Sequence, residues 1–195
     1  TEFEAYAVVL STYSTIPWAS RNHTKKVSKS MQRIEFSDLT PSTEYNISII
    51  SKNGDLDGGI ASTIAKTNLA PPDPRPNPPK IINQKSGFVT IEIDRAVNYN
   101  GPVSNYLIVI HFVDDELIHD FDESLLTSYQ KAQDVGLGYY IAAEIEPFNE
   151  ETKTFTVGDG FTYGRYLNPP LPNRHFHIII GVVSRMLDDQ MVTYS

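Results

Sequence analysis

The stretch that decides the fold reads Leu39-Thr40-Pro41-Ser42-Thr43-Glu44-Tyr45-Asn46-Ile47-Ser48-Ile49-Ile50. Its second half alternates: Tyr45, Ile47 and Ile49 fall on one face and polar residues lie between them, as in a half-buried strand. Pro41 favours a turn immediately before this strand. A buried tyrosine ring can still direct its hydroxyl to a polar partner, here the backbone of that turn. We therefore predict a strand that is entered through a sharp corner closed by Tyr45.

The spacing of Leu39, Pro41 and Tyr45, followed by the alternation, resembles the L-x-P-x-T-x-Y-x-I-x-I signature of fibronectin type III modules. These modules are immunoglobulin-like, all-β sandwiches with a tyrosine corner. The resemblance implies that Leu39, Pro41 and Tyr45 form a structural corner. It implies no chemistry, because sandwich modules host many unrelated functions.

The length of 195 residues suits two sandwiches of about 100 residues each. We predict a fibronectin type III domain at 1–69, a linker at 70–79 and a second, enlarged domain at 80–195. The linker has six prolines in ten residues, which favours an extended and semi-rigid spacer. A composition of 40% hydrophobic and 21% charged residues is that of a globular protein with real cores.

Composition excludes several function classes. The chain has no cysteine, so disulfides, zinc–thiolate sites and cysteine nucleophiles are absent. Residues 1–69 hold seven Lys and Arg and seven Asp and Glu, so 70–195 carries the whole net charge of −8. An acidic half argues against nucleic acid and against an anionic membrane surface as partners. No apolar run reaches the about 18 residues of a membrane span.

In the first domain, the pattern predicts strands at Phe3–Leu10, Gln32–Ser37 and Ile60–Thr67, with Ile34 and Phe36 turned inward. Phe3–Leu10 corresponds to the third strand of a sandwich, so the first two strands are missing. A sandwich without them would expose its core face. Either preceding residues of a longer protein supply them, which we favour, or Thr1–Ala5 and the neighbouring domain cover the gap.

The stretch Arg21–Lys29 is polar and basic. Its basic residues are sparse, so we interpret it as a solvated loop rather than a patch for an anionic glycan. Two sequons, Asn22-His23-Thr24 and Asn46-Ile47-Ser48, make Asn22 and Asn46 candidate N-glycan acceptors if the chain is secreted. Asn46 should point outward, because its neighbours Tyr45 and Ile47 point inward.

The second domain begins with an alternating strand at Phe88–Asp94 and a nearly all-apolar strand at Tyr106–Phe112. The segment 114–138 departs from the simple sandwich. It opens with an acidic loop that lacks the ligand spacing and turn glycine of a calcium loop, so a solvated loop is favoured. Glu123–Asp134 predicts a short helix capped by Asp122. Three apolar residues would share one face of this helix: Leu125, Leu126 and Tyr129.

From residue 139 onward the order Y-I-A-A-E, F-T-V-G-D-G, Y-G-x-Y and N-P-P-L-P is similar to the membrane-proximal ectodomain of receptor-type protein tyrosine phosphatases. The leukocyte-antigen-related and adhesive homophilic subgroups are the most similar, and the resemblance covers about residues 87–195. It implies structural roles for the matched positions, which are Tyr140, Ala143, Gly158, Gly160, Gly164, Asn168 and Pro170. Phe176 stands where these relatives usually have tyrosine, at the second domain's structural corner.

No arrangement in the chain points to catalysis. Gly158-Asp159-Gly160 lacks a phosphate-binding lysine and a following helix, so a hairpin turn is favoured. His111, His175 and His177 could lie near one another, but without a carboxylate scaffold they are bystanders rather than zinc ligands. We therefore expect no catalytic, cofactor-binding or metal-binding residue, and no cofactor.

The resemblance implies a function. The chain would be a non-catalytic spacer and ligand-presenting region of a single-pass type I receptor, on the extracellular side of the plasma membrane. It would contact the membrane only through a transmembrane helix beyond Ser195. The parent would carry cytoplasmic phosphatase domains and act in cell adhesion or axon guidance signalling. Its partners would be protein or glycan ligands of the cell surface or matrix, with homodimer contacts left open. The alternatives are a purely adhesive protein without any enzyme domain, and an enzyme with a metal site at the acidic loop.

Overall fold

A computed structural model describes residues 2–16, 22–31, 33–113, 121–186 and 189–195. The chain forms two compact units. The first is built mainly from Thr1–Pro71, and the second mainly from Pro72–Val97, Val103–Arg185 and Gln190–Ser195. They are called unit 1 and unit 2 below.

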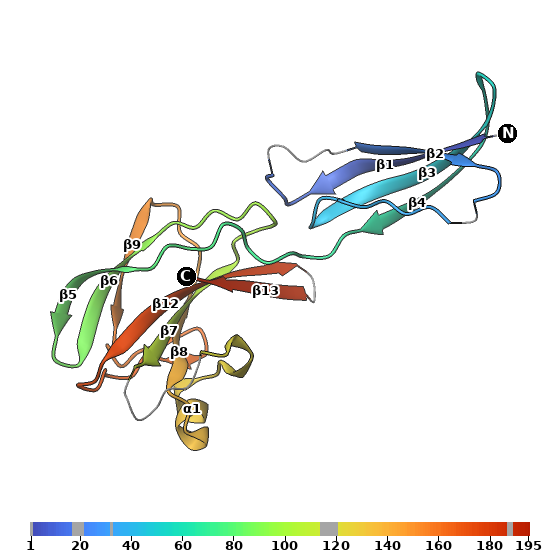
Figure 1. Ribbon diagram of the computed structural model, residues 1–195. Coiled ribbons are helices and arrows are strands. Elements are labelled where there is room, and N and C mark those ends of the chain that lie inside the picture. The colour runs from blue at the N-terminus through green and yellow to red at the C-terminus, as the bar shows by residue number, and fades with distance from the viewer. Residues whose placement is uncertain (1, 17–21, 32, 114–120, 187–188) are drawn as a thin grey trace. The chain divides into compact units, whose positions relative to one another are not determined.

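Unit 1 contains a four-stranded antiparallel sheet in the order β2-β1-β3-β4 (Figure 1). The strands are β1 (Glu2–Thr12), β2 (Asn22–Ser28), β3 (Thr43–Asn53) and β4 (Leu56–Lys66). The predicted strand Phe3–Leu10 lies inside β1, and Ile60–Thr67 lies in β4 apart from its last residue. The decisive stretch forms the corner before β3 and most of β3 itself.

The cross-strand register of unit 1 gathers apolar side chains on one face of its sheet. Ala5 lies opposite Ile49, Ala7 opposite Ile47, and Val9 opposite Tyr45. Because side chains alternate along a strand, the residues between them belong to the other face. The period of two that the sequence shows therefore becomes a sheet with one apolar face.

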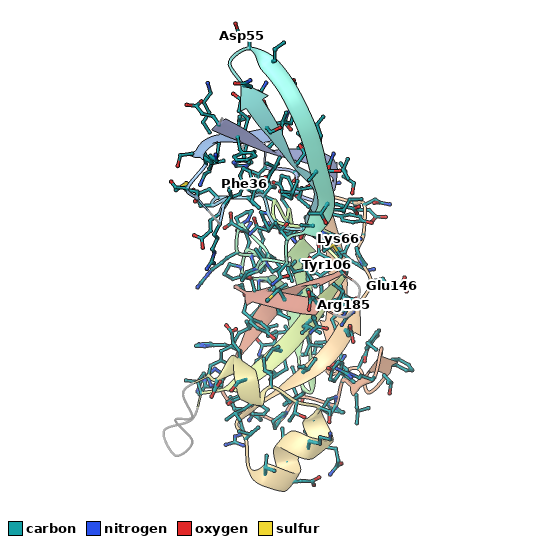
Figure 2. All side chains as sticks on the ribbon, turned by 90° about the vertical axis from the view of Figure 1, so that its right-hand side faces the viewer. Phe36, Asp55, Lys66, Tyr106, Glu146 and Arg185 are labelled. Carbon is teal, nitrogen blue, oxygen red and sulfur yellow. The ribbon has the colours of Figure 1, made fainter. Side chains whose placement is uncertain are left out.

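The predicted strand at Gln32–Ser37 is not a strand. Gln32 lies outside the described residues, and 33–37 make no sheet ladder. Ile34 and Phe36 nonetheless line a groove of about 310 Å³ on the apolar face (Figure 2 labels Phe36). Phe3, Ala5, Val27, Met31, Ile47 and Ile49 complete the lining. A strand requires a hydrogen-bonded neighbour, and 33–37 pair with no described strand of unit 1.

The basic stretch interpreted as a solvated loop is also different in the structure. Residues Asn22–Ser28 form β2, which pairs with β1. Arg21 lies outside the described residues. Val27 is buried opposite Phe3, whereas most other side chains of β2 are exposed. One buried residue among polar ones gives a weak strand signal in the sequence. The segment forms a strand because β1 provides the backbone groups with which it pairs.

Unit 2 is a sandwich of two antiparallel sheets. A four-stranded sheet has the order β13-β12-β7-β8, and a three-stranded sheet has the order β5-β6-β9 (Figure 1). A short hairpin, β10-β11, is added to them. The strands are β5 (Lys80–Lys85), β6 (Phe88–Asp94), β7 (Asn105–Phe112), β8 (Tyr139–Ile145), β9 (Thr152–Val157), β10 (Thr162–Tyr163), β11 (Tyr166–Leu167), β12 (Phe176–Met186) and β13 (Asp189–Tyr194).

The core of unit 2 lies between the two sheets. β6 contributes Val89, Ile91 and Ile93, each at most 1% exposed, as its alternation predicts. β7 is buried on both faces: Ile108 and Ile110 enter the core, whereas its other face belongs to a second apolar cluster. Strands covered on both faces read as continuous apolar runs, which explains why β7 shows almost no alternation.

The predicted helix at Glu123–Asp134 is wrong in extent. A single 3-10 turn, Glu123–Leu125, is followed by α1 (Tyr129–Val135). The chain between them is extended, because the Thr127 carbonyl accepts a 2.8 Å hydrogen bond from the Ile141 amide of β8. The Asp122 side chain does accept from the Ser124 amide as a cap. None of the helices in the described part of the chain is long and apolar enough to cross a bilayer.

Candidate functional site

Two buried tyrosines tie a backbone amide to a strand, one in each unit. The Tyr45 hydroxyl accepts from the Thr40 amide at 2.9 Å, five residues upstream. In unit 2 the Tyr106 hydroxyl accepts from the Ala96 amide at 2.7 Å. Both rings are 1% exposed, so each amide depends on its tyrosine for a partner. The sequence analysis missed the role of Tyr106, although its place at the start of an apolar strand was a usable signal.

The other proposed corner residues play lesser parts. Leu39 and Pro41 are half-buried at the start of the corner. Phe176 opens β12 and packs, half-buried, against the core of unit 2. Without a hydroxyl it can pack but cannot accept a backbone hydrogen bond.

The motif residues around Asn168 form a buried polar joint. Asn168 is fully buried, and its side-chain oxygen accepts from the Gly158 amide at 2.8 Å. Its amide group donates to the Thr156 carbonyl and to Asp159 Oδ1, both at 2.9 Å. Gly158 has a positive φ of 95°, and a Cβ there would lie 2.3 Å from the Gly87 carbonyl oxygen. Gly160 and Gly164 also have positive φ. The predicted hairpin glycines therefore allow backbone conformations that other residues rarely adopt.

A concave surface of unit 2 lies on the outer face of the four-stranded sheet. A second apolar cluster covers this face: Leu107, Val109, Ile141, Tyr166, Val183 and Tyr194. Beside it is a cleft of about 810 Å³. Aromatic residues Phe121, Tyr166 and Tyr194 line the cleft together with charged Arg165, Arg185, Asp122 and Glu123.

Both arginines of the cleft make side-chain hydrogen bonds. Arg185 Nη2 donates to Glu144 Oε1 at 2.6 Å, and Arg185 Nε donates to Gln190 Oε1 at 2.8 Å (Figure 2 labels Arg185). Arg165 Nε donates to the Tyr166 hydroxyl at 3.0 Å, with its guanidinium 5.2 Å from that ring. Paired arginines and apolar rings suit binding of an amphipathic surface. They do not provide a nucleophile with an adjacent base.

Two tyrosine hydroxyls near this surface resist ionisation. The hydrogen bond that the Tyr163 hydroxyl donates to Asp159, at 2.5 Å, is the main cause that raises the pKa of Tyr163 to about 12. Burial is the main cause that raises the pKa of Tyr194 to about 12, with the Glu123 carboxylate adding to it. Both hydroxyls stay protonated at neutral pH and do not act as bases.

The histidines do not assemble a metal centre among the described residues. His111 and His177 lie opposite each other on β7 and β12, with ring centroids 6.3 Å apart. His175 precedes β12, and its carbonyl accepts from the Val113 amide. Within the described ranges no group of three His, Cys, Asp or Glu side chains could hold a metal ion. Most of the acidic loop proposed as a calcium alternative, 114–120, lies outside them.

The two sequon asparagines lie in one row of the unit 1 sheet. Asn22 is opposite Val8 on β2, and Asn46 is opposite the same residue on β3. Asn46 is directed away from the face that carries Tyr45 and Ile47, because neighbours alternate along β3. Both asparagines are therefore on the face opposite the apolar groove.

The sequence model of a protein family described as the receptor-type tyrosine-protein phosphatase U Fn3 domain matches residues 73–193. The chain belongs to this family. The match covers nearly the whole of unit 2, so unit 2 is an Fn3 domain of this kind, and that domain is non-catalytic.

Three relatives extend the comparison. The putative inactive tyrosine-protein kinase Wsck of Drosophila melanogaster is 40% identical over 199 residues, which cover 97% of this chain and 25% of that protein. Receptor-type tyrosine-protein phosphatase U of Gallus gallus is 28% identical over 151 residues, covering 74% of this chain and 10% of that protein. Receptor-type tyrosine-protein phosphatase F of Danio rerio is 27% identical over 186 residues, covering 86% and 9%. The chain thus spans a quarter or less of each relative and is homologous to receptor-type proteins.

Proposed function

We propose that this chain is an extracellular spacer and ligand-presenting region of a single-pass cell-surface receptor. The observation that carries the proposal is the match of 73–193 to an Fn3 domain of a receptor-type protein. Unit 1 is then a further Fn3 domain ahead of it, which its Tyr45 corner and its sheet order support. The unit 2 cleft, with aromatic and paired charged residues, is the surface we propose for a protein or glycan ligand.

For the cytoplasmic part of the parent, we favour a tyrosine-kinase-like domain without activity. The support is the 40% identity to the Drosophila protein over 97% of the chain, which includes both units. The second candidate is a parent with phosphatase domains, as the sequence resemblance implies. It is supported by the family match and by the two phosphatase relatives at 27% and 28% identity. A role in cell adhesion or axon guidance is common to both candidates and stays a prediction.

Location is tested with antibodies raised against residues 73–193 and applied to cells that express the full-length parent. Labelling of intact cells is the expected result, since the proposal places this region outside the membrane. Labelling that appears only after permeabilisation would contradict it. An antibody against a cytosolic protein serves as the control for membrane integrity.

The identity of the parent is tested by sequencing its complete transcript. A transmembrane span followed by a kinase-like domain supports the first candidate. A span followed by the H-C-x-x-G-x-x-R loop of a cysteine phosphatase supports the second. A transcript with neither domain would leave the purely adhesive protein as the answer.

A further inference from the structure

The edge strand of unit 1 is unusually open. β4 is eleven residues long, and every residue in it is exposed. It pairs with β3 on one side and with no other strand among the described residues (Figure 1). Figure 2 shows it running between the labelled Asp55 and Lys66 along the side of the sheet. A long exposed edge offers a row of amide and carbonyl groups to another strand.

A β-bulge, one of the devices that block pairing, interrupts the β3–β4 ladder between Asp57 and Ile60, whereas the ladder from Ile60 to Lys66 is regular. β4 contains no proline, and its only charged residues are Asp57 and Lys66, near its two ends. Both are held within the sheet, Asp57 by Lys52 and Lys66 by Glu44 at 3.3 Å. Between them Ile60 and Ile64 are 66% and 61% exposed. They lie on the face opposite the apolar groove, so completion of a sandwich over that groove would not cover them.

We propose that β4 pairs with β4 of a second copy of this chain, antiparallel and around a two-fold axis at Ser62. In this register, opposed residues have numbers that add to 124. Ile60 then lies opposite Ile64 of the other copy, and the pair occurs twice. Cross-strand pairs of β-branched residues stabilise a sheet. Two sheets of four strands become one sheet of eight.

The charge of residues 1–69 is also compatible with a second copy of the chain pairing at the free edge of β4. Residues 1–69 have no net charge, because they hold seven basic and seven acidic residues. The two paired surfaces therefore add no net-charge repulsion of their own. This pairing does not depend on the receptor proposal, since it concerns the chain itself.

A single-cysteine experiment tests the register, because the chain has no cysteine of its own. Ser62→Cys places the two sulfurs at the axis, where opposed Cα atoms lie about 4.5–5.5 Å apart and within disulfide range. The matched control is Leu56→Cys on the same strand, which is 73% exposed. In the proposed register its two copies are about 40 Å apart. Under a glutathione buffer the first variant should form covalent dimers and the second should not. Equal cross-linking of both variants would overturn the proposal.

Charge substitutions test the same pairing without cysteine. In sedimentation equilibrium, Ile60→Lys combined with Ile64→Lys should raise the dimer dissociation constant by about tenfold or more, because like charges are opposed twice. Ile60→Lys combined with Ile64→Glu should restore dimers, since each lysine then faces a glutamate of the other copy. Circular dichroism verifies that both variants keep their sheets. A monomeric wild type would contradict the pairing of β4. Dimers whose dissociation constant is unchanged in all these variants would mean that another face forms the contact.

Discussion

Two buried tyrosines, one in each unit, each fix a corner of the chain through one hydrogen bond to the hydroxyl oxygen. Tyr45 and Tyr106 each offer a hydroxyl oxygen to one backbone amide. The rings supply apolar burial, and the hydroxyls supply the partner that a buried N–H needs. The same solution therefore appears twice, at two corners that the chain builds from different sequences.

Tyr45→Phe should lower the stability of unit 1 by about 1–3 kcal/mol, because the Thr40 amide would be left buried without a partner. Tyr106→Phe should have a smaller effect on unit 2, because the Ala96 amide is only partly buried and water can replace the lost partner. Chemical denaturation with a probe in each unit measures both effects. Tyr13→Phe is the control, since Tyr13 is 63% exposed. An unchanged midpoint in Tyr45→Phe would argue against the corner.

Tyr163 predicts a pH dependence at alkaline pH. Its pKa is raised from 10.0 to about 12, chiefly by the hydrogen bond to Asp159. The folded state therefore holds this proton more tightly than the unfolded state does. The stabilisation is complete below pH 10 and is lost as the pH rises through about 12. Tyr163→Phe should remove this part of the alkaline decline in the free energy of unfolding of unit 2. Parallel curves for the variant and the wild type between pH 10 and 12 would contradict it.

At the scale of elements, neighbouring strands decide what a segment becomes. Residues 33–37 keep their inward Ile34 and Phe36 but form no strand, whereas the polar Asn22–Ser28 forms β2 beside β1. The segment before α1 is pulled into an extended path by its bond to β8. Each of these outcomes depends on a partner that is distant in sequence.

Leu125 and Leu126 provide a matched test of that segment. Leu126 packs on the outer apolar cluster of unit 2, whereas Leu125 is 53% exposed. Leu126→Ser should lower the stability of unit 2 by about 1–2 kcal/mol, because the partly buried leucine side chain loses its apolar contacts with the cluster. Leu125→Ser should change it by less than about 0.5 kcal/mol. Thermal or urea unfolding measures both, and equal effects would mean that the segment packs differently.

At the scale of the whole molecule, the two units differ in net charge and in the number of sheets described in each. Unit 2 is a closed sandwich that belongs to a known Fn3 family. Unit 1 presents one sheet with an apolar groove on one face and both sequon asparagines on the other. We predict that the face with Asn22 and Asn46 is solvent-exposed in the parent and that both asparagines are glycosylated there.

Secretion of the chain from animal cells tests this inference. Asn22 and Asn46 should each carry an N-glycan, so the mass should fall on enzymatic deglycosylation. Asn22→Gln and Asn46→Gln should each remove one glycan, and the double variant should remove both. Protein made in the bacterial cytoplasm provides the unmodified reference mass. A secreted wild type without added mass would contradict the assignment.

The sequence by itself determined the alternation of Tyr45, Ile47 and Ile49, the inward residues of β6 and the positive φ of the glycines after β9. It could do so because these features depend on local periodicity and on local backbone sterics. It also carried the family resemblance that the match to 73–193 bears out. Only the tertiary structure decided that β2 is a strand, that 33–37 is not, that Tyr106 closes a corner and that Asn168 joins three partners. Those outcomes rest on hydrogen-bond partners brought close by folding, and no local pattern records which partner will be present.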